Sequence, residues 1–349
     1  MPSTPEMYLS DVSRSSVRER GITMVELVIT MAVMAVIMAA VTPLFTLLSR
    51  SFTNLEAGSV LPAGTQKALN RIQNRLGESR RLFENTTIGA AYLAKLPALP
   101  RTPVGWGQLP TINPGMALST HSAVFVSSAV GNSLFFASTY APNLLTNVGT
   151  VGTTVRVDSF MFNYYFISEN TSVVVNGKPS LELWEWHSIP YADYQQLSLM
   201  TPARSSSTAL ALRNQYGVTF AWDSSADVPA SAFYVLSTTG GVVAAPTHVI
   251  QTATDPKLRS ANMIQVISGA ASGGFKFGVS RNGFPQSHQV PIYGYNSSAS
   301  DFPGGLEIMI VGPSSSRQVF VRLVVTAQGN FKGLLSYENV VLLSARDLY

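Results

Sequence analysis

The longest apolar run of the sequence lies near its amino terminus, from Ile22 to Leu48, and Glu26 is the only charged residue within it. A helix that rises about 1.5 Å per residue makes this run roughly 40 Å long, and about 30 Å spans the hydrocarbon core of a membrane. Every face of this helix is apolar. The pattern therefore predicts a helix that lies in lipid or packs among similar helices.

A second helical pattern follows, and we expect residues 49–84 to continue the helix with a break near residues 58–64. The break is predicted by Gly58, Pro62 and Gly64. Helical spacing returns from Thr65 to Phe83, with one apolar face formed by Leu69, Ile72, Leu76 and Phe83. Between these positions lie five basic residues: Lys67, Arg71, Arg75, Arg80 and Arg81. No aromatic residue alternates with them, which favours a solvated or subunit-contacting face over a nucleic-acid patch.

Residues 85–349 have a different sequence pattern, in which short segments typical of β-strands are frequent. Proline and glycine in residues 85–120 predict a long loop, and Pro202–Thr208 and Tyr293–Ser300 predict further loops. The predicted strands are Ala123–Ser127, Leu134–Ser138, Val155–Ile167, Tyr216–Trp222, Phe233–Ser237, Met263–Ile267, Phe275–Val279 and Leu306–Val311. Two hairpins are predicted as well, Val173–Val175 with Leu181–Trp186 around Asn176-Gly177, and Gln318–Ala327 with Lys332–Leu343 around Gly329-Asn330.

Helix segregated from strands is the α+β pattern. We expect a long N-terminal helix, transmembrane in its first half and amphipathic in its second, packed on an antiparallel β-sheet head with extra loops. Arg14, Arg18 and Arg20 precede the apolar run. Basic residues there favour a cytoplasmic amino terminus, which places the head outside the cytoplasmic membrane.

Glu26 is the anomaly of the apolar run, because a carboxylate at the bilayer centre costs about 3 kcal/mol on insertion scales. Its context is Arg18-Glu19-Arg20-Gly21, then Ile22, then Glu26 four residues later, then the long apolar run. This combination resembles the class III signal of type IV prepilins and pseudopilins. The basic amphipathic stretch further on more loosely resembles the large minor pilins and pseudopilins of the PilW and GspJ kind.

The resemblance implies that prepilin peptidase cuts between Gly21 and Ile22 and removes the leader, residues 1–21. Ile22, in a place where phenylalanine is more usual, would become the N-methylated first residue. Glu26 would then pair with a terminal amine during docking into a filament whose core is residues 22–48. A buried carboxylate is tolerable when an amine pairs with it. Pro43 lies where many pilins carry a proline, and it predicts a helix kink.

Composition excludes several kinds of chemistry. The chain has no cysteine, so disulfides, thiol catalysis and zinc-thiolate sites are absent, and the net charge of +4 decides nothing about nucleic acid. We expect the four histidines, His121, His187, His248 and His288, to be surface or strand residues. Asp223 and Asp227 are weak candidates for calcium binding, and no other cofactor is expected. Trp184, Trp186, Tyr164 and Tyr165 fit core packing better than an exposed sugar-binding surface.

The hypothesis from sequence is therefore a minor pilin or pseudopilin, not an enzyme, from a type IV pilus or type II secretion-like filament. Its expected partners are prepilin peptidase, other pilins or pseudopilins, the cytoplasmic membrane and an assembly platform protein, with no specific nucleic acid. The minor role is favoured because the head is large for a subunit repeated along a thin filament. The alternative is a single-pass extracytoplasmic enzyme or adhesin that uses the helix only as an anchor.

Overall fold

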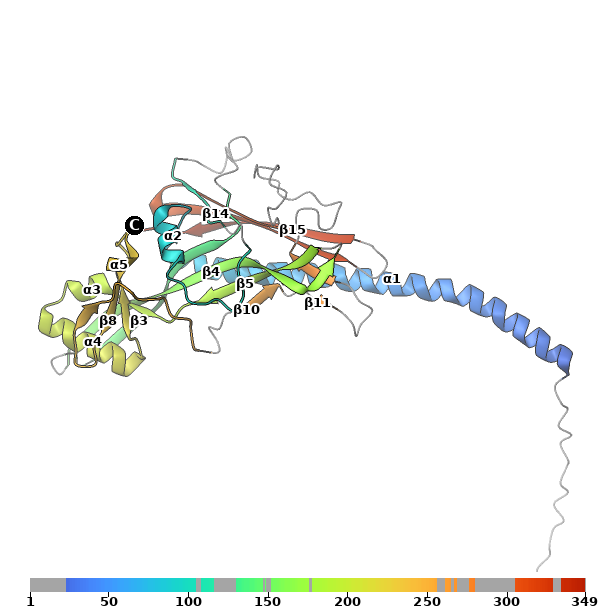
Figure 1. Ribbon diagram of the computed structural model, residues 1–349, viewed down its shortest axis with the longest axis horizontal. Coiled ribbons are helices and arrows are strands. Elements are labelled where there is room, and N and C mark those ends of the chain that lie inside the picture. Colours follow the sequence, from blue (N-terminus) through green and yellow to red (C-terminus); the bar gives the residue numbers. More distant parts are fainter. Residues whose placement is uncertain are drawn as a thin grey trace, which may run out of the picture. The chain divides into compact units, whose positions relative to one another are not determined.

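The computed structural model describes residues 23–104, 108–115, 130–146, 148, 152–175, 178–255, 261–264, 267–268, 276–279, 305–328 and 334–348. Its contacts divide the chain into two units, Met1–Ser51 and Phe52–Tyr349. The second unit, called the head below, contains the sheet and the C-terminal part of the first helix (Figure 1). The helices are α1 Met24–Leu76, α2 Thr87–Leu93, α3 Tyr194–Ser198, α4 Pro202–Tyr216 and α5 Pro229–Ala232, with a short 3₁₀ helix at Ser314–Ser316.

The described strands form one fifteen-stranded sheet that is mostly antiparallel. Its longest path runs β2-β13-β14-β12-β5-β4-β6-β7-β8-β9, and the parallel pairs on that path are β2 with β13 and β6 with β7. The strands are β1 Ser79–Phe83, β2 Ile112–Asn113, β3 Leu134–Thr146, β4 Thr154–Val175, β5 Lys178–His187, β6 Tyr191–Asp193, β7 Phe220–Trp222, β8 Phe233–Leu236, β9 Val242–Ala244, β10 Ala261–Ile264, β11 Ile267–Ser268, β12 Lys276–Val279, β13 Leu306–Val311, β14 Arg317–Gln328 and β15 Leu334–Ala345.

The C-terminal part of α1 covers one face of the sheet. Its buried apolar residues are Leu61, Ala68, Leu69, Ile72 and Leu76, and they share a core with strand residues such as Phe136, Ile167, Leu183, Val321 and Leu323. Alternation along the strands explains why these residues meet, since every second side chain points to the same face. Three residues of the predicted apolar stripe, Leu69, Ile72 and Leu76, are therefore covered by the sheet, as expected.

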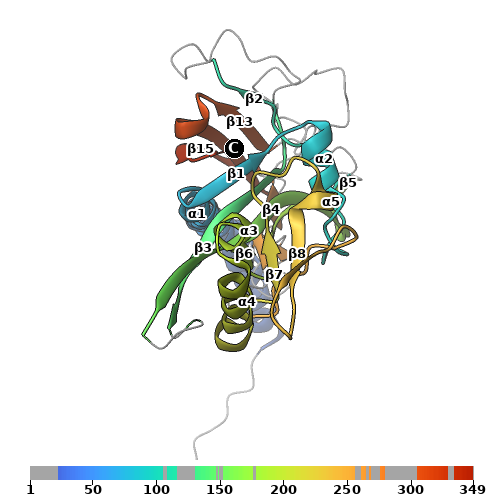
Figure 2. The same ribbon diagram turned by 90° about the vertical axis from the view of Figure 1, so that its left-hand side faces the viewer.

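The opposite face of β3 and β4 carries an aromatic core. Phe135 and Phe162 alternate with the residues that face α1, and they pack with Tyr92 from α2 and Phe233 from β8. A third core joins the ends of β3 and β4 to α3 and α4, through residues such as Val157, Leu197 and Leu212. Figure 2 shows α3 and α4 beside β6, β7 and β8, which together form this part of the head.

The predicted break in the helix is wrong, because α1 is continuous through residues 58–64. Leu61 and Thr65 are buried there, and the Thr65 hydroxyl donates to the Leu61 carbonyl at 2.8 Å. Packing of this turn against the sheet outweighs the hydrogen bond that Pro62 cannot make. The glycines cost helix propensity at exposed or half-buried positions, and tertiary contacts compensate for it.

The predicted end of this helix is also wrong. Helix α1 ends at Leu76, where Gly77 follows, and residues 79–83 form β1, paired with β3. Phe83 therefore lies in the aromatic core on the other side of the sheet, and Arg80 and Arg81 belong to a strand. An unpaired edge of β3 offered this segment a ladder of hydrogen bonds that a further helical turn could not match.

Two predicted loops contain regular structure. Residues 85–120 include α2 and β2, and Pro202–Thr208 begins α4, with Pro202 in the first helical turn where its missing N–H is harmless. As a consequence, Tyr216 ends a helix, and the strand predicted from it is confined to Phe220–Trp222. Both predicted hairpins are confirmed by the pairing of β4 with β5 and of β14 with β15. Ala123–Ser127 and Tyr293–Ser300 lie outside the described residues.

Candidate functional site

The first turn of α1 holds Glu26 by reciprocal hydrogen bonds with Thr23. The Glu26 N–H donates to Thr23 Oγ1 at 3.3 Å. In return, the N–H and the hydroxyl of Thr23 donate to Glu26 Oε2 at 2.9 and 3.0 Å. This is a capping box, in which a threonine before the helix and a glutamate three residues later satisfy each other's N–H groups. The carboxylate is fixed at the positive end of the helix dipole, next to the predicted cleavage point.

The helix that follows is long and apolar enough to cross a membrane. Met24–Ser49 has a mean hydropathy of 2.5, and none of it is buried against the rest of the chain. Its exposed side chains include Val28, Ile29, Val33, Met34, Val36, Ile37 and Leu44. Apolar surface on all sides needs lipid or other apolar helices around it. Gly21 and Ile22 lie outside the described residues, so cleavage and methylation there stay predictions.

Pro43 lies inside this helix, which continues on both sides of it. Proline cannot donate to the carbonyl of Ala39, so one helical hydrogen bond is missing. Nearby hydroxyls bond to neighbouring carbonyls, from Thr42 to Met38 and from Thr46 to Pro43, both at 2.7 Å. Threonine back-bonding of this kind bends helices slightly. The kink at Pro43 stays a prediction.

A second polar cluster lies in the head, between the last turns of α1 and strand β5. Arg71 forms an ion pair with the buried Glu185, and His187 Nε2 lies 3.5 Å from Glu185 Oε2. A cavity of about 280 Å³ beside them is also lined by Asn74, Arg75 and Glu78. Arg71 therefore neutralises a buried carboxylate of the head and is not part of a solvated basic face. Arg80 and Arg81 also leave the predicted basic helix face, because they lie in β1.

Asn163 decides which nitrogen of His187 carries the proton. The Asn163 amide donates to the Met161 carbonyl and the Ser138 hydroxyl, so its oxygen, 2.8 Å from His187 Nδ1, must accept. His187 Nδ1 is therefore the donor, and Nε2 faces Glu185. Burial, with help from Arg75 and Arg71, lowers the pKa of His187 from 6.5 to about 3. The ring is thus neutral near pH 7.

The two weak calcium candidates are each bound by other groups of the chain. Asp223 Oδ1 accepts hydrogen bonds from the backbone and hydroxyl of Ser225 and from Gln195. Asp227 is paired at 3.0 Å with Arg81, which also donates to the carbonyls of Ser224 and Ala226. Within the described ranges, no group of three or more acidic or histidine residues could hold a metal ion. The two carboxylates shape the loop after β7.

The aromatic residues singled out from the sequence are mainly core residues, as expected. Trp186 and Tyr165 are fully buried, and Tyr164 is nearly so. Trp184 is half-buried, with its indole N–H donating to Glu182 at 3.0 Å and the Arg101 guanidinium 5.8 Å from its ring centre. The ring face that a sugar would need is therefore occupied by Arg101.

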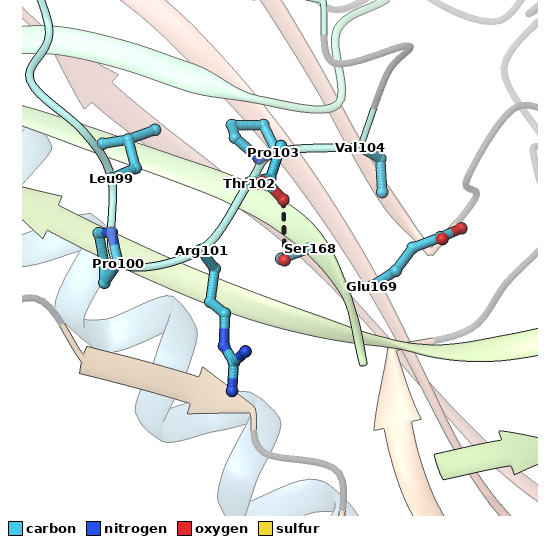
Figure 3. Close-up of a pocket in the computed structure, with 8 residues that line it drawn as sticks. All are labelled: Leu99, Pro100, Arg101, Thr102, Pro103, Val104, Ser168 and Glu169. Carbon is cyan, nitrogen blue, oxygen red and sulfur yellow. Dashed lines mark hydrogen bonds between the residues drawn. The ribbon is translucent and has the colours of Figure 1, made fainter. Parts of the chain in front are cut away.

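The hollow next to Arg101 has a volume of about 480 Å³. Figure 3 shows that it is bounded by the segment from Leu99 to Val104 and by Ser168 and Glu169 of β4. The Ser168 hydroxyl donates to the Thr102 carbonyl at 2.8 Å, which fixes this segment against the strand. The hollow therefore lies where the loop of residues 99–104 crosses the edge of β4.

Of the remaining histidines, the structure describes His248, which pairs with a tyrosine. His248 Nε2 lies 3.0 Å from the Tyr191 hydroxyl, and burial, aided by Lys95, lowers the pKa of this histidine to about 4. His121 and His288 lie outside the described residues. Sequence reasoning missed two features, Thr23 and the buried pair of Glu185 and His187. The first had a signal in the Thr-x-x-Glu spacing, whereas an acidic residue inside a strand pattern gives none.

Comparison with protein families gives a match near the amino terminus. Residues 17–42 match the family described as the prokaryotic N-terminal methylation motif. No curated protein gives a significant match, and no solved structure gives one. The matched segment contains the predicted cleavage point, Glu26 and the start of the apolar helix. The chain therefore carries, at residues 17–42, the N-terminal methylation signal of type IV pilin-like proteins.

Proposed function

We propose that this protein is a minor pilin or pseudopilin, a subunit of a type IV pilus or a type II secretion-like filament. One observation carries the proposal: a methylation motif overlaps an apolar helix whose first turn fixes a carboxylate. A plain membrane anchor needs the apolar helix but has no use for a carboxylate at its start.

In the proposed sequence, prepilin peptidase hydrolyses the peptide bond between Gly21 and Ile22. The new amine at Ile22 is a cation, which N-methylation preserves. Thr23 keeps the carboxylate of Glu26 oriented at the helix end before any amine is available. Glu26 then attracts the terminal amine of a neighbouring subunit. A buried carboxylate paired with an amine is tolerated where a lone one is not.

The proposed location follows from the helix and the leader. Before assembly, the protein spans the cytoplasmic membrane once, with its amino terminus in the cytoplasm and its head outside. The apolar helix then leaves the bilayer for the filament core, with help from an assembly platform protein. The large head favours a minor subunit over one repeated at every step of the filament. The role needs no metal, cofactor or nucleic acid, and we propose no catalytic activity.

The test is to determine the amino terminus of the protein isolated from cells, by sequencing and mass measurement. The expected result is a chain that begins at Ile22 and carries one methyl group. Gly21→Leu should leave the leader attached without changing the head. A wild-type chain that retains Met1 in cells with an active prepilin peptidase would contradict the proposal and support the anchored enzyme or adhesin instead.

A further inference from the structure

A cluster of polar side chains lies in the core between α1 and the sheet. Tyr165 of β4 is directly opposite Glu185 of β5, and Asn163 is directly opposite His187. Opposite residues of an antiparallel pair share a face, and Tyr165 belongs to the core that packs on α1. All four side chains therefore face the helix, and each residue is at most 2% exposed. Buried polar groups cost free energy unless they find partners.

His187 and Glu185 face each other through atoms that both accept hydrogen bonds. Because Nδ1 of His187 is the donor to Asn163, Nε2 carries only a lone pair. Glu185 Oε2 lies 3.5 Å from this nitrogen, and Arg71 favours the ionised form of the carboxylate. Two acceptors cannot bond to each other. A group that carries several donors is therefore needed beside them.

The cavity of about 280 Å³ described above adjoins these two acceptors. Its walls from α1 are Arg71, Asn74 and Arg75, whose guanidinium and amide groups donate hydrogen bonds. Arg75 is half-buried and forms no ion pair with any residue that the structure describes. The volume is close to the lower limit of small-molecule sites, about 300 Å³. The cavity therefore suits a molecule the size of an amino acid, with acceptors on the strand side and donors on the helix side.

The charges around this cavity are balanced. Arg71 and Arg75 carry two positive charges, and Glu78 and Glu185 carry two negative charges. His187 is neutral near pH 7, because burial lowers its pKa to about 3. A ligand with one charge of each sign keeps this balance, whereas an anion or a cation disturbs it. An ammonium group has three donors for the two acceptors, and a carboxylate matches a guanidinium.

We propose that the cavity binds a small α-amino acid as a zwitterion. Its ammonium group donates to Glu185 Oε2 and His187 Nε2, and its carboxylate accepts from Arg75 and Asn74. Binding involves no covalent step. The site lies within the head, so it goes beyond the proposed filament role and does not depend on it. Because its walls belong to α1 and β5, the bound amino acid holds the helix against the sheet and stabilises the fold.

The first test uses NMR of the full-length chain in detergent, with isotope-labelled histidine. His187→Gln identifies the resonances of His187. Near pH 7 we expect a protonated Nδ1 and an unprotonated Nε2, and L-serine should shift the Nε2 resonance because its ammonium group donates to this nitrogen. The opposite tautomer overturns the proposal, since Nε2 would then donate to Glu185 and no ligand donor would be needed. An Nε2 resonance that about 10 mM L-serine leaves unchanged overturns it as well.

The second test is isothermal titration calorimetry of the same full-length chain with matched small molecules. L-Serine carries both charges, L-glycerate has a hydroxyl in place of the ammonium group, and ethanolamine lacks the carboxylate. We expect L-serine to bind at least about tenfold more tightly than either of the others. Equal affinity for L-glycerate would show that a neutral donor suffices, and it would overturn the proposal. The absence of binding by L-serine, glycine and L-alanine at about 10 mM would do the same.

The third test removes the charge that holds the ligand carboxylate. Arg75→Gln should weaken the binding of L-serine about tenfold and should not weaken that of ethanolamine, which has no carboxylate. A disturbed fold would weaken both. Lys67→Gln, at an exposed position of the same helix, is the matched control and should bind L-serine as wild type does. L-Serine binding that is equal in Arg75→Gln and wild type, or a loss shared with ethanolamine, overturns the proposal.

Discussion

Arg71 and Glu185 differ in how each tolerates the loss of the other. Glu185 is buried, whereas the side chain of Arg71 is 41% exposed. Removing Arg71 leaves a buried carboxylate without its cation, which is more costly than leaving a hydrated guanidinium. We expect Arg71→Ala to lower the free energy of unfolding by about 2–3 kcal/mol. Chemical unfolding followed by the fluorescence of the buried Trp186 and Trp222 measures this.

Lys67 on the same helix is the control, because it is exposed and lies outside this ion pair. Lys67→Ala should change the free energy of unfolding by less than about 0.5 kcal/mol. Adding Glu185→Gln to Arg71→Ala should recover part of the loss, since the amide can donate to His187 Nε2. Equal effects of Arg71→Ala and Lys67→Ala would show that the pair contributes nothing to folding.

The lowered pKa of His187 leads us to expect that the folded chain loses stability in acid. Its pKa is about 3 in the folded chain, against 6.5 ordinarily. Between these values the unfolded chain binds a proton that the folded chain does not. The stability from this residue is therefore complete above pH 6.5 and declines as pH falls toward 3, by up to about 1.4 kcal/mol per pH unit.

Unfolding curves of wild type and His187→Gln between pH 7 and pH 4 test this. The variant should lose less stability over that range than the wild type. His248, whose pKa is also lowered, acts in the same direction in both proteins. Burial raises the pKa of Asp193 and Asp347, which acts in the opposite direction. Because these groups are common to both chains, parallel curves would mean that His187 is not the cause.

Single residues differ in how far sequence alone could place them. Glu26 stood out because a charge in an apolar run is costly. Thr23 had a recognisable spacing to Glu26, but the apolar pattern drew attention away from it. Glu185 and His187 follow strand alternation in which a polar side chain normally indicates solvent. Only the position of Arg71 above the sheet shows that they face inward, and no local pattern encodes that position.

At the scale of elements, Pro62 gives a direct test of the continuous helix. A proline inside a helix costs about 3 kcal/mol through a missing hydrogen bond and steric conflict. Pro62→Ala should therefore raise the free energy of unfolding, by roughly 1–3 kcal/mol. The neighbouring Ala63 is exposed, and Ala63→Gly should lower the same quantity by about 1 kcal/mol.

These two variants separate a helix from a break. In a non-helical segment, Pro62→Ala would give no gain, because proline also restricts the unfolded chain. Ala63→Gly would then cost only a few tenths of a kcal/mol. Denaturant midpoints of both variants, compared under one condition, give the answer without a new structure.

Elements were predictable where burial follows a simple period. β13 was predicted with the observed bounds, and the terminal hairpin nearly so, because both are continuous apolar or alternating segments. Helix α4 was missed, since Pro202 and its serines are typical of loops, although proline is favourable in a first helical turn. β1 was missed because its partner β3 lies far away in sequence. Such pairing depends on contacts that a local pattern does not contain.

For the whole molecule, the signal was predictable from residues 17–42, whereas the use of the head was not. The methylation motif is local and depends on a few spaced residues. The sheet of the head pairs strands that lie far apart in sequence, such as β1 with β3. A local motif therefore indicates the signal, whereas the arrangement of the head depends on contacts that no local pattern contains.

The last prediction concerns the effect of Glu26 on filament assembly. Glu26→Ala removes the carboxylate but leaves the leader, the cleavage point and the apolar helix unchanged. Membrane insertion and cleavage should therefore be normal, while the assembled fraction falls by about tenfold, as expected for the loss of about 1.4 kcal/mol of attraction. Amino-terminal sequencing of the membrane form and quantification of the sheared filament fraction measure the two steps separately.

Thr23→Val is the matched variant, because it keeps the charge of Glu26 and removes the hydroxyl that helps to hold it. The Thr23 N–H still donates to Oε2, so this variant should assemble better than Glu26→Ala and less well than wild type. If the charge itself guides docking, the order must be wild type, Thr23→Val, Glu26→Ala. If Glu26→Ala were to assemble as well as wild type, the apolar helix alone would suffice, and the carboxylate would serve only as a cap on the first turn.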